Sequence, residues 1–405
     1  MKHLLFSIFL ACLFISCAND TETEIQDDDT SLDEYQAVID NYLDINLSSL
    51  DDYSSSTAPD YIAKDNTIEN EISNEGATLG RVLFYDVNLS SDNTVACATC
   101  HQQAFAFTDD HLLSNGVNGK TGRHSMRIVN ARFSEEEKFF WDERASSLEE
   151  QSTMPIQDHT EMGFSGENGD GDLNDLITKL EGLEYYNVLF EFVYGDNEIT
   201  EVRIQNALAQ FERSIESFDS KYDVGRELTT TDVAPFPNFT TEENNGKRLF
   251  FERPTFNDVG ERIDGGFGCA GCHRAPEFDI DPNSMSNGVV SLFDDLSSAD
   301  DIDVEVTRSP SLRDIINPDG TLNGGFAMHH GGFVSMEEVL EHYNNIPDFS
   351  ATPELIAQID QRLLPNGYSQ KLNMTQQEID EVISFLQTLT GNTLYSEDKW
   401  SSPFK

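Results

Sequence analysis

The chain has 405 residues, of which 38% are hydrophobic and 10% aromatic, so it can bury one large core or two ordinary ones. Its 74 acidic and 25 basic residues give a formal net charge of -49, which excludes a general nucleic-acid binder and disfavours binding to anionic membranes. A basic protein partner and calcium are compatible with this charge, although a solvated acidic surface explains it more simply.

The first residues predict export from the cytoplasm. Lys2 precedes an apolar run from Leu4 to Ile15, which is too short to span a membrane and is typical of a secretory signal. Phe14-Ile15-Ser16-Cys17 resembles a bacterial lipoprotein cleavage box, with Phe14 in place of the usual leucine. We therefore expect residues 1–16 to be a lipoprotein signal peptide and Cys17 to carry a lipid that tethers a periplasmic protein to the outer membrane. Cleavage by an ordinary signal peptidase is the alternative.

The segment that follows is rich in acidic and hydroxyl side chains. It contains too little apolar surface to fold alone, so residues 17–65 are predicted to form an acidic spacer. Within it, Tyr35 to Leu50 has a weak helical period, which indicates a short helix docked on the body of the protein. The globular part is expected to begin near Asn66, and Ala77 to Asp86 is predicted to be its first helix.

Two copies of one cysteine motif follow in the chain. They are Cys97-Ala98-Thr99-Cys100-His101 and Cys269-Ala270-Gly271-Cys272-His273. The two thiols of such a motif can each add to a haem vinyl group, and the histidine then becomes an axial ligand of the iron. The motifs therefore predict two covalently bound c-type haems. A four-cysteine zinc site is the alternative, but zinc does not explain the histidine after each pair.

The approach to each motif is also similar. Leu79 to Tyr85 precedes the first motif and Gly246 to Phe251 the second, each with a small residue, a basic residue and then apolar and aromatic positions. This similarity predicts an internal repeat in which a helix packs a Leu/Phe face on each porphyrin. A helix before the haem motif is typical of cytochrome c folds.

The later part of the chain is predicted to be mainly helical as well. Apolar spacing of three and four residues predicts that Leu173 to Phe192 and Ile199 to Phe218 pair as an antiparallel helical hairpin. The two prolines of Glu227 to Asn238 indicate an interdomain linker, and the glycines of Gly320 to Gly332 indicate a loop. Further helices are expected at Met336 to Tyr343, Pro353 to Leu363 and Thr375 to Leu389, the last capped by Thr375 and stopped by Gly391.

These elements together predict the fold class. It is mainly α, with two cytochrome c-like haem domains, long loops and little β structure. The N-terminal domain is expected at residues 66–228 and the C-terminal domain at residues 229–395, with the last helix packing back on the first domain.

A further series of short motifs runs through both predicted domains. They are Leu79-Gly80-Arg81-Val82-Leu83-Phe84-Tyr85-Asp86 with Leu89-Ser90, Cys97 to His101, Phe139-Phe140-Trp141-Asp142-Glu143-Arg144, Arg308-Ser309-Pro310-Ser311-Leu312-Arg313, His329 with Gly331, and Glu337-Glu338-Val339-Leu340-Glu341-His342-Tyr343-Asn344. In this order they resemble the diheme bacterial cytochrome c peroxidase and MauG family, from about Asn66 to about Gly391. In that family the first haem reacts with peroxide, which needs a vacant iron position, and the second passes electrons to it.

The resemblance implies roles for five residues. His101 would be the proximal ligand of the peroxidatic haem and His273 that of the electron-transfer haem. Glu161 matches the active-site glutamate of the family. Cleavage of an O–O bond needs a proton carried from one oxygen to the other, and a carboxylate can carry it. Gln151 matches the neighbouring glutamine, whose amide can hold peroxide by hydrogen bonds. Trp141 matches the tryptophan that relays electrons between the haems, with a buried core aromatic as the alternative.

The axial positions of the two irons depart from the typical peroxidases. Gly116 stands where enzymes that need reductive activation carry a distal histidine, so the first iron is expected to be open, with His111 as the alternative ligand. Tyr343 stands where a methionine usually binds the second iron, as in the MauG members of the family. We expect Tyr343 to be this ligand, with Met285 or Met328 as the alternatives.

Two further histidines occupy family positions. The family holds calcium between its domains with an asparagine side chain and backbone carbonyls, and His124 replaces that asparagine here. Carbonyls alone make a weaker site for a hard cation, so calcium is only a candidate cofactor beside the two haems. His329 matches a histidine near the second haem.

The leading functional hypothesis is reduction of hydrogen peroxide to water with two electrons from a small periplasmic donor, either a cytochrome c or a cupredoxin. A MauG-like reaction is the alternative, in which both irons share the oxidising equivalents and oxidise side chains of a partner protein. A third hypothesis is a diheme electron carrier without catalysis, against which Glu161 and Gln151 argue. No nucleic-acid partner is expected, and membrane contact is expected only through the lipid anchor.

Overall fold

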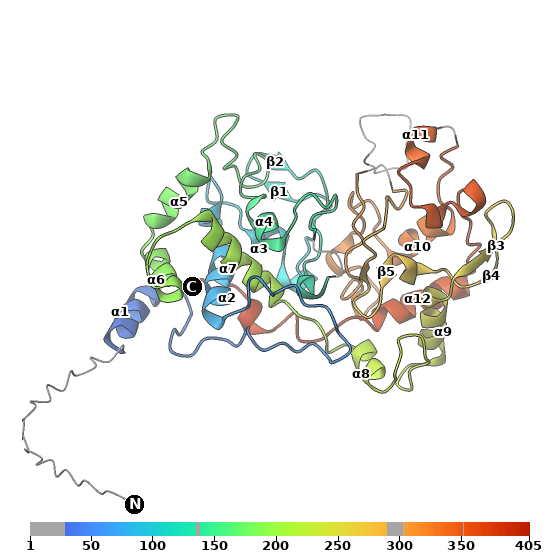
Figure 1. Cartoon of the computed structure of the whole chain (residues 1–405), viewed down its shortest axis with the longest axis horizontal. Helices are drawn as coiled ribbons and strands as arrows, with labels where there is room; N and C mark the ends of the chain where they lie inside the picture. The colour runs from blue at the N-terminus through green and yellow to red at the C-terminus, as the bar shows by residue number, and fades with distance from the viewer. Residues whose placement is uncertain (1–28, 135–137, 290–302, 304, 351) are drawn as a thin grey trace, which may run out of the picture.

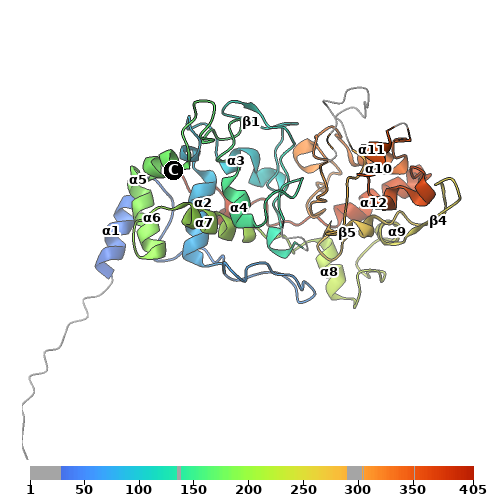
Figure 2. The ribbon, with the colours of Figure 1, turned by 45° about the horizontal axis from the view of Figure 1, so that its top comes forward.

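The computed structural model describes residues 29–134, 138–289, 303, 305–350 and 352–405. The predicted signal peptide and Cys17 lie outside these residues. Two groups of helices lie side by side, one coloured blue to green and the other yellow to red (Figures 1 and 2). The described part is mostly helical, as predicted, and its strands form only two-stranded sheets. Within it, every helix is too short or too polar to cross a membrane.

A pair of crossed helices forms the centre of the first core. Helix α2 (Asn74–Tyr85) packs against α7 (Glu201–Arg213), and α4 (Leu148–Thr153) packs on the same α7. A Cβ atom built on Gly80 of α2 would lie 1.9 Å from the carbonyl oxygen of Ala207, so only glycine allows this close approach. The predicted first helix is therefore confirmed, and its glycine sets the distance to α7.

The second core repeats this arrangement. Helix α9 (Thr241–Phe251) packs against α12 (Gln376–Gln387), and a Cβ atom on Gly246 would lie 1.8 Å from the carbonyl oxygen of Glu381. Gly246 in α9 thus corresponds to Gly80 in α2. In each half a glycine-containing helix leads into a Cys-x-x-Cys-His motif, which confirms the repeat predicted from the sequence.

The remaining elements are short. The helices are α1 (Asp29–Ile39), α3 (Cys97–Cys100), α5 (Leu173–Glu181), α6 (Glu184–Tyr194), α8 (Lys221–Glu227), α10 (Met336–Asn344) and α11 (Pro353–Ile356). The strands are β1 (Asn115–Gly116), β2 (Gly119–Lys120), β3 (Pro254–Phe256), β4 (Arg262–Gly265), β5 (His273–Arg274) and β6 (Asp279–Ile280). Strand β1 pairs with β2, β3 with β4 and β5 with β6, and each pair is antiparallel. Long loops connect them, as expected.

Several predicted helices differ in extent or partner. The helix predicted from Leu173 to Phe192 is divided at Gly182 into α5 and α6, and α6 packs on α1 and α2. The expected hairpin with α7 is therefore wrong, because α7 buries its apolar face against α2 and α4 instead. The predicted helix from Pro353 is limited to α11, followed by a 3-10 turn at Gln361–Leu363. The cap of α12 was predicted correctly, since Thr375 and Glu378 form a reciprocal capping box.

Segments from both ends of the described chain cover the first core. Leu43 forms a β-bridge with Phe404, and Leu43, Tyr53 and Trp400 are all buried in this core. The folded body thus begins at α1, well before Asn66, because apolar side chains of the acidic segment meet the C-terminal tail. It is this tail, and not the last helix α12, that returns to the first half of the chain (Figure 1).

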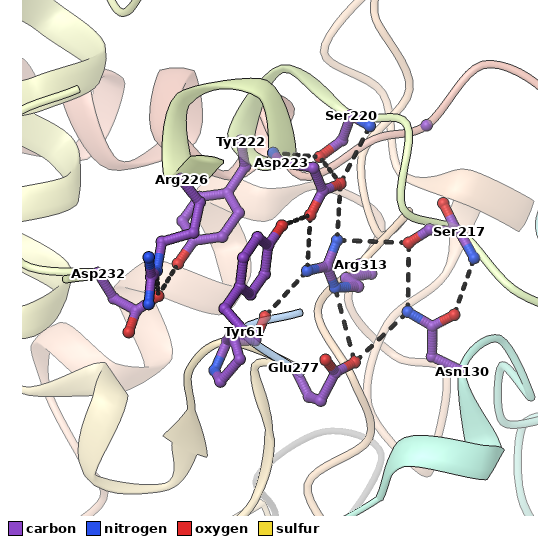
Figure 3. A network of polar contacts seen from close by, with 12 residues as sticks. Tyr61, Asn130, Ser217, Ser220, Tyr222, Asp223, Arg226, Asp232, Glu277 and Arg313 are labelled. Atoms are coloured by element: carbon purple, nitrogen blue, oxygen red, sulfur yellow. Dashed lines mark hydrogen bonds and ion pairs between the residues drawn. The ribbon is translucent and has the colours of Figure 1, made fainter. Parts of the chain in front are cut away.

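A buried polar network joins the two halves (Figure 3). Arg313, which is fully buried, donates to both carboxylate oxygens of Asp223 on α8, each at 3.0 Å. It also donates to the Ser217 carbonyl, and its Nε atom lies 3.8 Å from the Glu277 carboxylate. Asn130 of the first half receives a hydrogen bond from the backbone N–H of Ser217. Such a network stabilises the contact between the halves as long as each buried charge is paired, because an unpaired buried charge is strongly destabilising.

Candidate functional site

The first Cys-x-x-Cys-His motif presents a histidine ready to bind a metal. Cys97 and Cys100 lie at the two ends of the short helix α3, and His101 follows it directly. The His101 Nδ1 atom lies 3.1 Å from the Phe107 carbonyl oxygen, so Nδ1 must carry the hydrogen. Burial lowers the pKa of His101 and keeps the ring neutral at pH 7. The Nε2 lone pair is therefore available to an iron, as haem ligation requires.

The two thiols of this motif are free to form thioether bonds. Cys97 and Cys100 form no disulfide, although they are three positions apart. Burial raises the pKa of both thiols, and carboxyl groups raise it further: Glu212 and Glu161 act on Cys97, and Asp109 and Glu161 act on Cys100. These carboxyl groups are thus close enough to this motif to act on its thiols through their charge. The residues present fit a covalently held haem.

Glu161 lies in a loop that packs on the β1–β2 hairpin. Its backbone N–H donates to Asp158 at 2.9 Å, and its carbonyl receives the N–H of Val117 at 3.0 Å. Burial, followed by the negative charge of Asp158, raises the pKa of Glu161 to about 7. A carboxyl group with this pKa can both accept and release a proton near neutral pH, which is the property of a general acid/base.

Gly116 leaves no room for a side chain beside Glu161. A Cβ atom on Gly116 would lie 2.0 Å from the Thr160 carbonyl oxygen and 2.8 Å from the Glu161 Cα atom. The loop that could have offered a distal ligand therefore packs its backbone directly against the Glu161 loop. A histidine at this position would require the two loops to separate.

The other two residues considered at the first site are Gln151 and His111. Gln151 is half-buried on α4, and in the described part of the chain no hydrogen bond joins its side chain to Glu161. The His111 ring is about half exposed, and its Nδ1 atom lies 3.1 Å from Asp109 and 2.8 Å from Asp110. These carboxylates raise the pKa of His111 and hold the ring at the surface.

The second motif lines a cavity of about 590 Å³ between the two halves. Cys269, Cys272 and His273 all face this cavity, and the two thiols form no disulfide. Burial lowers the pKa of His273 to about 4, despite the nearby carbonyl groups of Phe278 and Pro310. The ring is therefore neutral and can bind a metal. A mostly apolar cavity with two free thiols and a neutral histidine fits a second covalent haem.

The predicted sixth ligand and both alternatives reach this same cavity. Tyr343 on α10, Met328 and Met285 all line it. Asn287 donates to the Tyr343 hydroxyl at 3.1 Å, and the same Nδ2 atom lies 3.5 Å from the Met328 sulfur. Burial raises the pKa of Tyr343, so its hydroxyl keeps its proton until a metal or another positive charge displaces it.

Trp141 lies at the junction between the halves. Its side chain lines the cavity of the second motif, and its ring meets His329 edge to face at 6.2 Å. Its Nε1–H donates to the His124 carbonyl at 2.8 Å, while its own carbonyl receives the N–H groups of Thr307 and Arg308. Three hydrogen bonds, one of them from the indole itself, and the ring contact with His329 thus hold Trp141 in place at the junction.

Glu212 is a residue that the sequence interpretation missed. It lies on α7 with 5% of its surface exposed, and among the described residues its Oε2 atom has no hydrogen-bond partner. Burial raises its pKa to about 8. The only signal in the sequence that could have identified Glu212 is its position as a charged residue within the apolar stripe of α7.

Comparison with known proteins identifies relatives. Residues 74–228 match the family described as di-haem cytochrome c peroxidase. The methylamine utilization protein MauG of Methylophilus methylotrophus is 29% identical over 339 residues, which cover 81% of this chain and 86% of that protein. The cytochrome c551 peroxidase of Nitrosomonas europaea is 25% identical over 78% of this chain and 80% of its own. A crystal structure of a MauG-like protein associated with microbial copper homeostasis covers 86% of this chain and 99% of its own, with 25% identity and a TM-score of 0.63.

Proposed function

Because this chain belongs to the di-haem cytochrome c peroxidase and MauG family, we propose that it reduces hydrogen peroxide to water. The two electrons come from a small periplasmic donor, a cytochrome c or a cupredoxin. The observation that carries this proposal is the Glu161 carboxyl group near the first haem motif, whose pKa is raised by burial to about 7. The loop that packs against Glu161 has Gly116 where a distal histidine ligand would stand. A non-catalytic electron carrier has no use for such a group.

The proposed reaction consumes one peroxide, two electrons and two protons and yields two waters. Haem attached at Cys97 and Cys100 supplies the iron that binds and reduces the peroxide. With a haem held there, the Glu161 carboxylate would take a proton from one peroxide oxygen and return it to the other, which would leave as water. Gln151 is proposed to orient the peroxide by hydrogen bonds without adding a charge.

The second motif and Trp141 are proposed to supply the electrons. His273 and Tyr343 both line the second cavity and would hold a haem there, which would supply electron transfer. Trp141 belongs to the first half, where it donates a hydrogen bond to His124, and it also lines the cavity of the second motif, which supports its role as the relay. If Trp141→Phe transferred electrons between the haems as fast as the wild type, this role would fail.

A second candidate function is the oxidation of side chains of a partner protein. It is favoured by Tyr343 in the second cavity, since an anionic phenolate ligand stabilises the higher oxidation states of iron. The similarity to MauG proteins agrees with this reading. Peroxide consumption at steady state with reduced cytochrome c as the only donor distinguishes the two, because the second function also needs the partner protein.

The deciding experiment is a titration of the oxidised holoprotein with hydrogen peroxide, followed by absorption and paramagnetic resonance. We expect a stoichiometric change at a high-spin first haem, followed by continuous turnover when reduced cytochrome c is added. Glu161→Gln should keep both haems and lose the turnover. Absence of any spectral response to peroxide would leave only the electron carrier.

We propose that the protein acts in the periplasm, anchored to the outer membrane through Cys17. The apolar run before Cys17 and the lipoprotein-like box support this location. Cells fed with radiolabelled palmitate should label the wild-type protein but not a Cys17→Ala variant. Label that persists in this variant would contradict the anchor.

A further inference from the structure

His124 fills a site surrounded by backbone carbonyl groups. Only 4% of its surface is exposed, and its Nδ1 atom lies 3.0 Å from the His111 carbonyl oxygen and 3.2 Å from that of Leu112. Carbonyl oxygens only accept hydrogen bonds, so Nδ1 must carry a hydrogen that both oxygens share. Burial lowers the pKa of His124, and the ring is therefore neutral at pH 7 with its hydrogen on Nδ1.

The same residue ties together three segments at the junction of the halves. Its backbone N–H donates to the His329 carbonyl at 2.6 Å, and its carbonyl receives the Trp141 Nε1–H at 2.8 Å. Its ring packs 5.8 Å from the Phe326 ring of the second half. The second half also approaches Leu112, since a Cβ atom on Gly331 would lie 2.7 Å from the Leu112 carbonyl oxygen.

These contacts do not fit the calcium ion that the family implies at this position. Calcium binds six to eight oxygen atoms at about 2.3–2.6 Å, and an N–H group cannot be one of its ligands. Here the carbonyl oxygens of His111 and Leu112 face the Nδ1 hydrogen, and the imidazole ring fills the space in front of them. An asparagine at position 124 would instead present an amide oxygen to a cation.

We propose that the His124 imidazole takes the place of the calcium ion, so that the junction around Trp141 is held without metal. The N–H of the ring hydrogen-bonds to the carbonyl oxygens of His111 and Leu112, so neither oxygen needs a cation as its partner. This proposal concerns the junction alone and stands whether or not the protein reduces peroxide.

The experiment compares calcium binding by the wild-type holoprotein and by His124→Asn. Calorimetric titration with calcium chloride should give no binding heat at this junction for the wild type, and its Tm should be the same in excess calcium and in EGTA. His124→Asn should lose Tm in EGTA and regain it in calcium, because the variant gains an oxygen ligand and loses the N–H group. His159→Asn, at a partly exposed loop histidine, is the matched control and should show no calcium response.

Two results would overturn the proposal. One is a wild-type protein whose Tm rises with calcium and falls with EGTA. The other is a folded His124→Asn that gains no response to calcium, since the ring would then not be what excludes the ion. If His124→Asn does not fold, His124→Gln provides the same amide oxygen, and the wild-type titration by itself still decides the first result.

Discussion

The backbone of Gly116 touches the backbone of Thr160 so closely that a Cβ atom on the glycine would lie 2.0 Å from the Thr160 carbonyl oxygen. Val117, the next residue, donates its N–H to the Glu161 carbonyl at 3.0 Å. The loop that lacks a distal ligand is thus the same loop that positions the proposed acid/base. The close contact between the backbones of Gly116 and Thr160 thus both excludes a side chain at position 116 and fixes the position of Glu161.

Gly116→Ala should therefore destabilise the protein. Overpacking of this kind costs about 1–3 kcal/mol, because the Glu161 loop has to move away from the added methyl group. Gly122→Ala is the matched control, since a Cβ atom there meets nothing within 4 Å, and it should change stability by less than about 0.5 kcal/mol. Chemical denaturation of the holoproteins measures both values, and equal stability of the two variants would contradict the close contact.

The rate of reaction with peroxide should depend on the ionisation of Glu161. Since burial raises its pKa to about 7, the carboxyl group is protonated below pH 7 and ionised above it. A base must be ionised to accept the proton, so the second-order rate constant should rise with pH and level off above about 7. Stopped-flow measurements should show this rise in the wild type and in Glu150→Gln, an exposed control on α4, and no rise in Glu161→Gln.

Glu212 should make the protein less stable as the pH rises. Its folded pKa of about 8 lies above its ordinary value of 4.5, so between these values the unfolded chain releases a proton that the folded protein keeps. The free energy of unfolding then falls from pH 5 to pH 8. Glu212→Gln does not undergo this ionisation, so it should be more stable than the wild type by on the order of 4 kcal/mol at pH 8, with little difference at pH 4.5.

The control for this prediction is Glu191→Gln, at an exposed position of α6. Its stability should follow that of the wild type at every pH. A Glu212→Gln variant whose denaturation curves shift equally at both ends of the pH range would show that ionisation is not involved.

Removal of the Arg313 guanidinium should weaken the junction between the halves. Arg313→Met leaves the buried Asp223 carboxylate without its cation, and loss of one member of a buried ion pair costs about 3–5 kcal/mol. Arg248→Met removes an exposed pair with Glu252 on α9 and should cost at most about 0.5 kcal/mol. Urea denaturation compares them, and a small effect of Arg313→Met would mean that Asp223 finds another partner.

The sixth ligand of the second haem can be identified by two substitutions in one cavity. Tyr343→Phe removes the proposed ligand oxygen but keeps the ring, so the second haem should become high-spin in its absorption and paramagnetic resonance spectra. Met328→Leu keeps the volume and should leave these spectra unchanged, although Met328 lies beside the same Asn287. The reverse pattern would identify Met328 as the ligand.

Local signals predicted much of the structure correctly. The helix cap at Thr375 and the repeated helix before each cysteine motif depend on residues within a few positions of one another, and both are present. The helical hairpin was predicted wrongly because an apolar stripe shows that a helix is buried but not against what. Helix α7 packs against α2 and α4. The reason for a glycine at position 80 is visible only in the fold, which places the Ala207 carbonyl oxygen next to it.

The sequence is enough to identify the two Cys-x-x-Cys-His motifs as haem-attachment candidates, because thiols and an imidazole at fixed short spacing need no distant partner to be recognised. It also determined that the fold is mainly helical. The fold was needed to show that burial raises the pKa of Glu161 and of Glu212, and to show what His124 contacts. Burial and hydrogen-bond partners set these properties, and both come from segments far apart in the chain.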